Sequence, residues 1–366
     1  MPVPIAERLA SQLLSGPPAT SVDAVVERLL AVQAQDANGA RLAVRARSDG
    51  LSAADVNSAL NDRLVVITWV NRGTLHLVRS EDYAWLHALT TPQLATGNAR
   101  RLEQEGVSPA QADRGVVAVE RALAEDGPLT RAALRERLDA AGVPTAGQAL
   151  IHILLLATIR GLIVRGPMVD GDHAFVLVRD WLGARAAAPV DRDAALAELA
   201  RRYLAGHAPA DARDLARWAG IGLRDARAGL KAIGPDLVER KDGLLSLARG
   251  SAGDAAEPTT EAGRSAAGGP AADAAPSLPG PRLLGPFEPL LLGWCSRDHI
   301  IGPHRGLVTT NGIFKAFALV DGRAVATWRL PGGRVQVEPL RKLTRAETDA
   351  LAEDARDVER FIGARE

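Results

Sequence analysis

Hydrophobic and polar positions follow one repeating order in the first 249 residues: two amphipathic helices and then two short β-prone runs. In the clearest copy, Thr130 is suited to cap a helix, because its hydroxyl can accept a hydrogen bond from a free amide of the first turn, and Gly142 is suited to end it. A turn at Gly171-Asp172 separates the β-prone runs. The elements expected in this copy are helices over 131–141 and 146–160 and strands over 162–165 and 175–178. Helix, turn, helix and hairpin in this order predict a winged helix.

Two other copies lie on either side of this one. In the first copy the helices begin at Ser21 and Ser52, and the strands flank Asn71-Arg72-Gly73. The elements expected in the first and third copies are helices from 21 and from 52, strands over 64–69 and 74–78, helices over 211–219 and 223–233, and strands over 237–240 and 244–247. Their irregular spacing indicates duplicated modules rather than a solenoid.

Residues 250–281 interrupt the pattern. Of these 32 residues, 24 are Ala, Gly, Pro or Ser, and none is aromatic. Such a stretch buries too little apolar area to offset the entropy of ordering, so we expect a flexible linker or surface loop.

Strand signals dominate after this stretch. The β-prone runs are 306–310, 314–320, 324–330 and 334–338, and Asn311-Gly312 and Asp321-Gly322 favour tight hairpins because they tolerate positive φ. A small barrel or curled sheet is the expected closure. A final amphipathic helix over 345–362 is expected to dock on the body.

These patterns predict an α+β protein with three tandem winged-helix modules, a small C-terminal β-barrel and a terminal helix. The expected domain bounds are 1–92 for the first winged helix, 93–190 for the second, 191–249 for the third, 250–281 for the linker, and 282–366 for the barrel and terminal helix.

Composition narrows the class of protein. The chain has 366 residues, 44 basic and 44 acidic, so its formal net charge is +0, which argues against a protein that coats nucleic acid by bulk electrostatics. A single cysteine, Cys295, excludes an internal disulfide and a thiolate zinc cluster. The N-terminus lacks the apolar core of a signal peptide, and no apolar run is long enough to span a bilayer. We therefore expect a cytoplasmic protein without metal, cofactor or membrane contact.

Stacked winged helices favour DNA as the partner, because each module offers a helix for a groove and a hairpin for the backbone. Residues 282–340 carry seven Lys or Arg against four Asp or Glu, a local excess of +3. The candidate DNA-binding residues are Arg41, Arg45, Arg72, His299, His304, Arg305 and Lys315. Arg47 is a weaker candidate, and Arg41 and Arg45, at i and i+4, equally fit a solvated helix face.

The segment Ala31-Val-Gln-Ala-Gln-Asp36 resembles the Gln-Φ-Gln signature of the AlkZ-like branch of the winged-helix DNA glycosylases; the related YcaQ-like branch has Asp where Gln35 stands. Other segments agree with this resemblance, which covers nearly the whole chain apart from the long linker: Arg72-Gly-Thr-Leu-His76, Leu129-Thr-Arg131, Arg201-Arg-Tyr203, Leu283-Leu-Gly-Pro-Phe287 and Leu290-Leu-Leu-Gly293.

The resemblance implies a fold, a site and a substrate. The family has a C-shaped channel around duplex DNA, and its catalytic pair falls on Gln33 and Gln35. Its substrates are N7-alkylated purines, including bulky natural-product adducts and interstrand crosslinks, removed in base excision repair or in self-resistance of an antibiotic producer. The partner implied is double-stranded DNA carrying alkylated purines, bound by a monomer.

Two glutamines suit this chemistry although an amide neither donates nor accepts a proton near pH 7. A purine alkylated at N7 is already cationic and departs without being protonated. The remaining task is to stabilise an oxocarbenium-like sugar and to hold the water that attacks C1′, which a carboxamide oxygen can do. Residues i and i+2 of a regular helix point about 200° apart, so we expect the pair at the end of a helix, with Gly39 just beyond it.

Several alternatives stay open. Without the resemblance, Gln33 and Gln35 are ordinary polar surface positions, and Asp36 is a competing catalytic carboxylate. His76, Trp69, Trp218 and Trp328 are most simply structural. No lysine lies near the motif, so a Schiff-base lyase step is not expected and the enzyme should be monofunctional. The rival functions are a winged-helix transcription regulator and a protein-binding scaffold. A hairpin over 309–315 is expected to anchor the duplex.

Overall fold

The computed structural model describes residues 4–186, 189–248 and 278–363. It is a mixed helical and strand protein with open sheets. The predicted linker, 250–281, lies outside the described residues except for its last four positions. None of the described helices combines the length and the apolar character needed to cross a bilayer.

The first 80 residues contain both predicted helices, capped where the pattern placed their starts. Ser21 accepts a hydrogen bond from the amide of Ala24, and Ser52 forms a capping box with Asp55. The elements are α1 (Ile5–Ser11), α2 (Val22–Leu29), β1 (Val32–Gln33), α3 (Ala37–Arg45), α4 (Ala53–Asn61), β2 (Val65–Val70) and β3 (Thr74–Arg79). The pattern did not reveal β1, because two residues carry no periodicity.

The second copy has the predicted order of elements, although its two strands extend further toward the turn than predicted and Val178 begins the helix that follows. Thr130 accepts a hydrogen bond from the amide of Ala133, and Gly142 has a φ of 67° just past the helix end. The elements between residues 83 and 181 are α5 (Tyr83–Thr90), α6 (Leu94–Gln104), α7 (Pro109–Asp126), α8 (Arg131–Ala140), α9 (Ala149–Ile159), β4 (Ile163–Val169), β5 (Asp172–Leu177) and α10 (Val178–Trp181).

The hairpins of these two copies join in one five-stranded sheet of order β1-β3-β2-β4-β5. Strand β2 pairs with β4 at Ile67 and Arg165. Side chains alternate across the sheet, so that Ile67 and Leu77 face one apolar cluster and Val66 and Val78 face the other. The sheet therefore fixes the first two copies relative to each other.

The third copy has the predicted order but stands apart from this sheet. It comprises α11 (Arg192–His207), α12 (Ala212–Ala219), α13 (Leu223–Ala232), β6 (Leu237–Glu239) and β7 (Leu245–Leu247), and its two strands form a sheet of their own. The long helix α11 supplies Leu199 and Tyr203 to the cluster beneath Val66 and Val78.

The C-terminal part differs from the prediction. Its elements are β8 (Arg282–Leu284), α14 (Pro289–Leu292), α15 (Asp298–Ile301), β9 (Phe317–Val320), β10 (Arg323–Arg329), β11 (Gln336–Pro339) and α16 (Arg345–Gly363). The described strands form an open sheet of order β11-β10-β9-β8, so the expected closed barrel is wrong. The expected strand 306–310 is also wrong, because only one bridge, Val308 to Phe314, forms there. Helix α16 covers β8 and buries Leu351, Val358 and Phe361.

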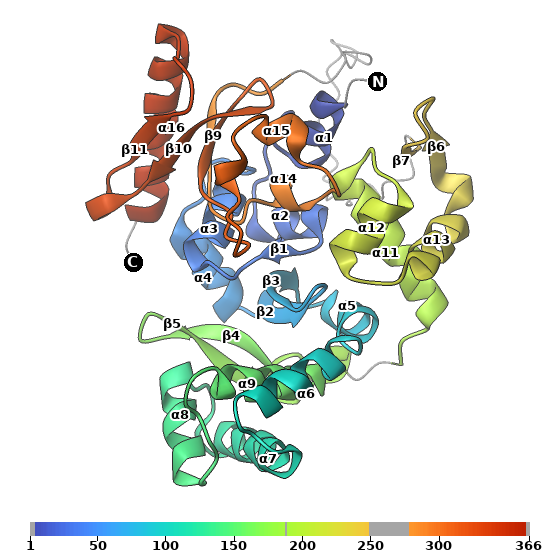
Figure 1. Cartoon of the computed structure of the whole chain (residues 1–366), viewed down its shortest axis with the longest axis vertical. Helices are drawn as coiled ribbons and strands as arrows, with labels where there is room; N and C mark the ends of the chain where they lie inside the picture. The colour runs from blue at the N-terminus through green and yellow to red at the C-terminus, as the bar shows by residue number, and fades with distance from the viewer. Residues whose placement is uncertain (1–3, 187–188, 249–277, 364–366) are drawn as a thin grey trace, which may run out of the picture.

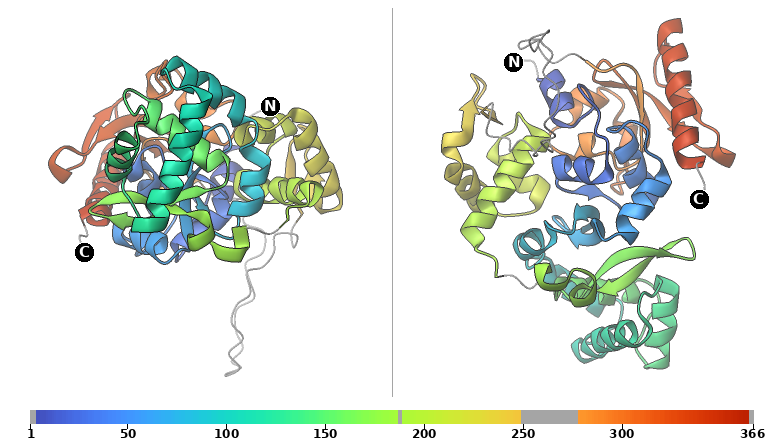
Figure 2. Two further views of the ribbon diagram at one scale, coloured as in Figure 1. Left: turned by 90° about the horizontal axis from the view of Figure 1, so that it is seen from below. Right: turned by 180° about the vertical axis from the view of Figure 1, so that it is seen from behind.

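Figure 1 places the first 80 residues in the middle of the molecule. The C-terminal sheet with α16 lies on one side, α11–α13 on the other, and α6–α9 beyond the five-stranded sheet. The view from behind in Figure 2 shows the same arrangement. Strand β1, at the start of segment 31–36, thus lies near the middle of the molecule.

Candidate active site

Gln33 is the last residue of β1 and Gln35 lies on the short connection between β1 and α3, and their side chains meet. Nε2 of Gln33 donates a hydrogen bond to Oε1 of Gln35 at 2.6 Å. Gln33 is 6% exposed, whereas Gln35 is exposed. The pair thus has an inner member held by the sheet and an outer member that reaches solvent.

The expected placement at the end of a helix is wrong. Gln33 belongs to β1, which pairs with β3, and Gln35 precedes α3. Side chains two residues apart on an extended chain point the same way, so the i, i+2 spacing suits a strand better than a helix. Gly39 does not end a helix but lies in the first turn of α3, where a Cβ would come within 2.5 Å of the carbonyl oxygen of Pro286. Glycine is needed at position 39 because α3 and the backbone of Pro286 approach each other closely there.

A row of polar side chains continues from Gln33 across the sheet. Gln33 is opposite His76 on β3, and His76 is opposite Thr68 on β2. Nδ1 of His76 lies 2.9 Å from the carbonyl oxygen of Thr74, so in the neutral ring this nitrogen carries the proton. Burial, aided by the positive charge of Arg72, lowers the pKa of His76 to about 3. His76 is therefore neutral near pH 7 and supports the strand beneath Gln33.

Asp36, the competing catalytic carboxylate, caps α3. Its Oδ1 accepts a hydrogen bond from the amide of Gly39 at 2.6 Å. Arg41, one turn further on, donates to Oδ1 of Asn57 at 2.7 Å, and burial lowers its pKa. Among the described residues Arg41 therefore has a neutral amide as its hydrogen-bond partner and makes no ion pair with a carboxylate.

A groove of about 440 Å³ is lined by Asp36 and Asn38, which follow the glutamine pair closely in the chain. Its walls include Phe314, Lys315 and Trp328 of the C-terminal part. The turn of segment 309–315 closes with a hydrogen bond from the amide of Gly312 to the carbonyl of Thr309. Its tip exposes Ile313, whose exposed fraction is 51%, and Lys315 is exposed beside it. The predicted hairpin thus lines the same groove as Asp36, the residue after Gln35.

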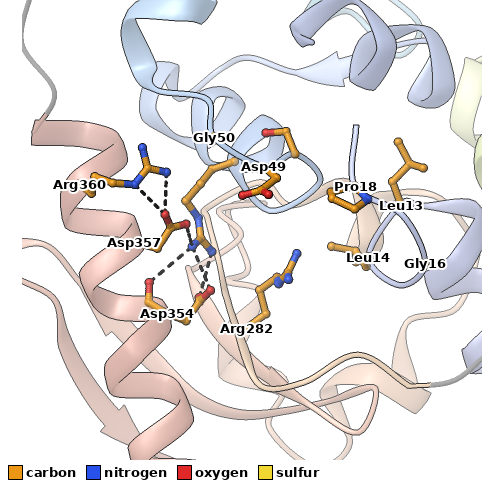
Figure 3. Close-up of a pocket in the computed structure, with 12 residues that line it drawn as sticks. Leu13, Leu14, Gly16, Pro18, Asp49, Gly50, Arg282, Asp354, Asp357 and Arg360 are labelled. Carbon is orange, nitrogen blue, oxygen red and sulfur yellow. Dashed lines mark hydrogen bonds and ion pairs between the residues drawn. The ribbon is translucent and has the colours of Figure 1, made fainter. Parts of the chain in front are cut away.

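Arg45 does not fit the predicted phosphate contact, because it is buried and ion-paired. Its guanidinium lies 3.0 Å from Oδ2 of Asp354 and 2.9 Å from Oδ2 of Asp357 on α16. Figure 3 shows these carboxylates on α16, with Arg360 on the other side of Asp357. Arg47 is fully buried and pairs with Glu288, so it does not fit a phosphate contact either. Both arginines hold α3 to the C-terminal part.

The remaining candidates lie in different places: Arg72 is in the turn between β2 and β3, whereas His304 lines a cavity with Asp321 and Arg323 at the β9–β10 turn. Arg72 donates to the backbone carbonyls of Arg217 and Trp218 on α12. His299 is half-buried, and burial lowers its pKa to about 4, so it is uncharged near pH 7. Arg305 is exposed and His304 half-buried. The motifs in the sequence did not reveal Arg217 and Arg297, which lie close to Arg72 in the fold. Burial is the largest cause that lowers the pKa of Arg72, and the positive charges of Arg217 and Arg297 lower it further.

The tryptophans Trp69, Trp218 and Trp328 are 7%, 4% and 7% exposed and belong to the core, as expected. In the described ranges no three His, Cys, Asp or Glu side chains are grouped as metal ligands would be.

The site consists of two uncharged amides close to a groove, with basic side chains nearby. Comparison with known proteins identifies the class of protein to which the chain belongs. The profile of the AlkZ-like DNA glycosylases matches residues 26–361. The chain belongs to this family, and it is a DNA glycosylase rather than a transcription regulator.

Two relatives are similar over nearly the full length. An interstrand DNA cross-link repair glycosylase of Streptomyces sahachiroi is 28% identical over 376 aligned positions, covering 97% of this chain and 95% of the relative. The solved structure of the Streptomyces sahachiroi DNA glycosylase AlkZ superposes with a TM-score of 0.75 at 26% identity, covering 98% of this chain and 95% of that one.

Proposed function

We propose that this protein removes N7-alkylated purines from duplex DNA, including bulky adducts and interstrand crosslinks, and that Gln35 and Gln33 carry the reaction. The observation on which this rests is the hydrogen bond between the two amides, at a loop where one member is exposed. The name of the Streptomyces relative supports crosslinks as substrates. We further propose a role in base excision repair, or in self-resistance where the cell makes an alkylating antibiotic.

The unequal exposure of the pair divides the work. Gln35 faces the substrate, and its Oε1 keeps one lone pair beyond the one used by Gln33. This oxygen accepts a hydrogen bond from the attacking water and faces the positive charge that develops at C1′. Gln33 is a positioning residue, because its side chain is almost fully buried and acts through Gln35.

The reaction needs no acid from the protein. The glycosidic bond breaks with its electron pair going to the purine, which neutralises the positive charge that alkylation placed on N7. Water forms the new bond to C1′, and its proton passes to solvent. An undamaged purine leaves as an anion unless it is protonated, so an uncharged pair discriminates against it.

We also infer that the three helix–helix–hairpin units are winged helices with bounds 1–92, 93–190 and 191–249, followed by a C-terminal part over 282–366. The capped helices and their following hairpins support this. The exposed Ile313 and Lys315 support a role for segment 309–315 in anchoring the duplex. The enzyme acts as a monomer in the cytoplasm, and it leaves an abasic site because no lysine adjoins the pair.

The test is base release from a duplex that contains N7-methylguanine, followed by heating with base and detection of strand scission. Gln35→Ala should slow single-turnover release by about 10²–10³-fold, the usual effect of losing one preorganised group. Gln104→Ala, an exposed glutamine on α6, is the matched control and should behave as wild type. Equal rates for Gln35→Ala and wild type would overturn the assignment.

The positioning role of Gln33 predicts an asymmetry between two isosteric changes. Gln33→Glu removes the donor and sets a carboxylate against Oε1 of Gln35, so it should lower kcat with little change in KM. Gln35→Glu keeps an acceptor for the Gln33 amide and should retain more activity. Circular dichroism and Tm establish that both variants fold. Equal losses in the two variants would refute the division of roles.

A further inference from the structure

Four arginines from distant parts of the chain gather beside the β2–β3 turn: Arg72 in the turn, Arg217 on α12, and Arg297 and Arg305 around α15. Within the described ranges none of the four makes an ion pair with a carboxylate. A groove of about 320 Å³ is lined by Arg217, Arg297 and Arg305, together with Cys295, Ser296 and one carboxylate, Asp298. The lining is therefore net positive.

Two of the four arginines, Arg72 and Arg297, are held in place by uncharged partners. Arg72 is fixed by the backbone carbonyls of Arg217 and Trp218. The guanidinium carbon of Arg297 lies 5.0 Å from the ring centre of Phe314, and its Nε is buried without a hydrogen-bond partner among the described residues. The segment between α14 and α15 is tied to α12 by a 2.8 Å hydrogen bond from the Cys295 amide to Asp214, and Figure 1 shows the two segments meeting.

The positive charges in this cluster repel one another. Burial lowers the pKa of Arg72, and the nearby charges of Arg217 and Arg297 lower it further. Burial and Arg217 also lower the pKa of Arg297. Like charges held together at a partly buried surface destabilise the folded state, and a bound anion removes that cost. A tetrahedral phosphate offers oxygens in several directions, which suits guanidiniums that approach from separate elements.

The cluster is linked to the glutamine pair on two sides. Arg72 lies in the turn before β3, whose His76 is opposite Gln33. Arg297 stacks on Phe314, which lines the groove that begins at Asp36, the residue after Gln35. These contacts connect the arginine cluster with the elements that hold the glutamine pair.

We propose that Arg217, Arg297 and Arg305, supported by Arg72, form a seat for a backbone phosphate of the DNA strand that carries the lesion. This inference rests on the proposed function and adds a binding site to it. The seat fixes the register of the strand relative to Gln35 and carries no base specificity, as is usual for phosphate contacts.

The affinity for an undamaged duplex tests the seat without chemistry. Arg217→Ala and Arg297→Ala should each weaken binding by about tenfold, the effect of losing one charge-assisted contact. Each should also lower the slope of log K against log salt by about 1. Arg345→Ala, which removes an exposed arginine on α16, is the control and should change neither value. Tm establishes that the variants fold.

Cys295 provides a second readout, because it is the only cysteine of the chain, is exposed and lines the groove. A duplex at about ten times its Kd should slow alkylation of this thiol by about tenfold, since about nine-tenths of the protein is then bound. Inorganic phosphate at the same concentration should give no protection.

Three results would overturn the proposal. They are wild-type affinity and salt slope in both arginine variants, alkylation of Cys295 that the duplex does not slow, and protection by inorganic phosphate equal to that by the duplex, which would indicate a free-anion site. Base release from N7-methylguanine by the wild type is assayed separately. Its absence would refute the proposed function, whereas normal release with unaltered DNA binding in the variants would refute only the phosphate seat.

Discussion

Polar side chains lie at both ends of helix α3, only ten residues apart, yet the two groups differ in charge, in burial and in the partners they bind. Before the helix, Gln33 and Gln35 are uncharged, bind each other, and leave one member exposed. At its end, Arg45 and Arg47 are charged, buried and bound to carboxylates of the C-terminal part. Charge is used here to hold the molecule together, and neutral amides are left to meet the substrate.

The difference follows from what each end contacts. A buried charge needs a partner, and Asp354, Asp357 and Glu288 supply it from segments more than 200 residues away. An amide is less costly to leave partly unpaired at a surface. A site for a cationic lesion benefits from this, because a fixed positive charge there would oppose the substrate.

Among the variants that test this difference between the two ends of α3, Arg47→Met is expected to have the largest effect on stability. It leaves Glu288 buried without its charge partner and should lower the free energy of unfolding by about 3–5 kcal/mol, measured by urea denaturation. Base release per folded molecule should stay near wild type. The double variant Arg47→Met/Glu288→Gln should recover part of the loss. A cost under about 1 kcal/mol, typical of an exposed pair, would contradict the structural role.

A smaller effect is expected from Gly39→Ala, which acts between the two ends. The added Cβ would lie 2.5 Å from the carbonyl oxygen of Pro286, so the first turn of α3 must shift, at about 1–3 kcal/mol of stability. Because this turn follows directly after Gln35, base release should also slow. Gly97→Ala replaces a glycine inside α6 that has no neighbour within 4 Å and no left-handed φ, and so controls for glycine loss in a helix. Unchanged stability and activity in Gly39→Ala would show that the contact is not needed.

At neutral pH the smallest effect is expected from His76→Gln, which instead changes the pH dependence of stability. Burial lowers the pKa of folded His76 to about 3, while the unfolded value is 6.5. The unfolded chain therefore binds this proton first, and the contribution to stability, complete above pH 6.5, is lost as the pH falls toward 3. The variant should reduce the slope of unfolding free energy against pH by about 1.4 kcal/mol per unit between pH 6 and 4. Identical slopes would show that His76 takes up its proton in the folded protein.

Local features of the fold could be predicted from the sequence. The caps at Ser21, Ser52 and Thr130 and the turns at Gly171 and Gly322 depend on neighbouring residues, and the structure contains all of them. The merging of the first two hairpins in one sheet depends on the pairing of Ile67 with Arg165, which no local pattern reveals. The expected barrel was wrong for the same reason, since closure depends on how distant edge strands meet.

The candidate site, too, could be predicted from the sequence only in part. The pair Gln33 and Gln35 stood out by resemblance alone, and its role remains a prediction. Arg45 and Arg297 look alike along the chain, but one finds carboxylates on α16 and the other lies over Phe314. Which arginine is available to DNA is decided by tertiary contacts, and those cannot be read from spacing.

The central claim is that the lesion supplies the positive charge that lets two uncharged amides suffice. The most direct measurement is single-turnover base release from two matched duplexes, one with N7-methylguanine and one in which alkali has opened the imidazolium ring of the same lesion, which removes its charge and keeps its methyl group. The account predicts slower release of the ring-opened base by about 10²–10⁴-fold, the usual worth of a general acid that this site lacks. Equal rates for the two lesions would contradict it.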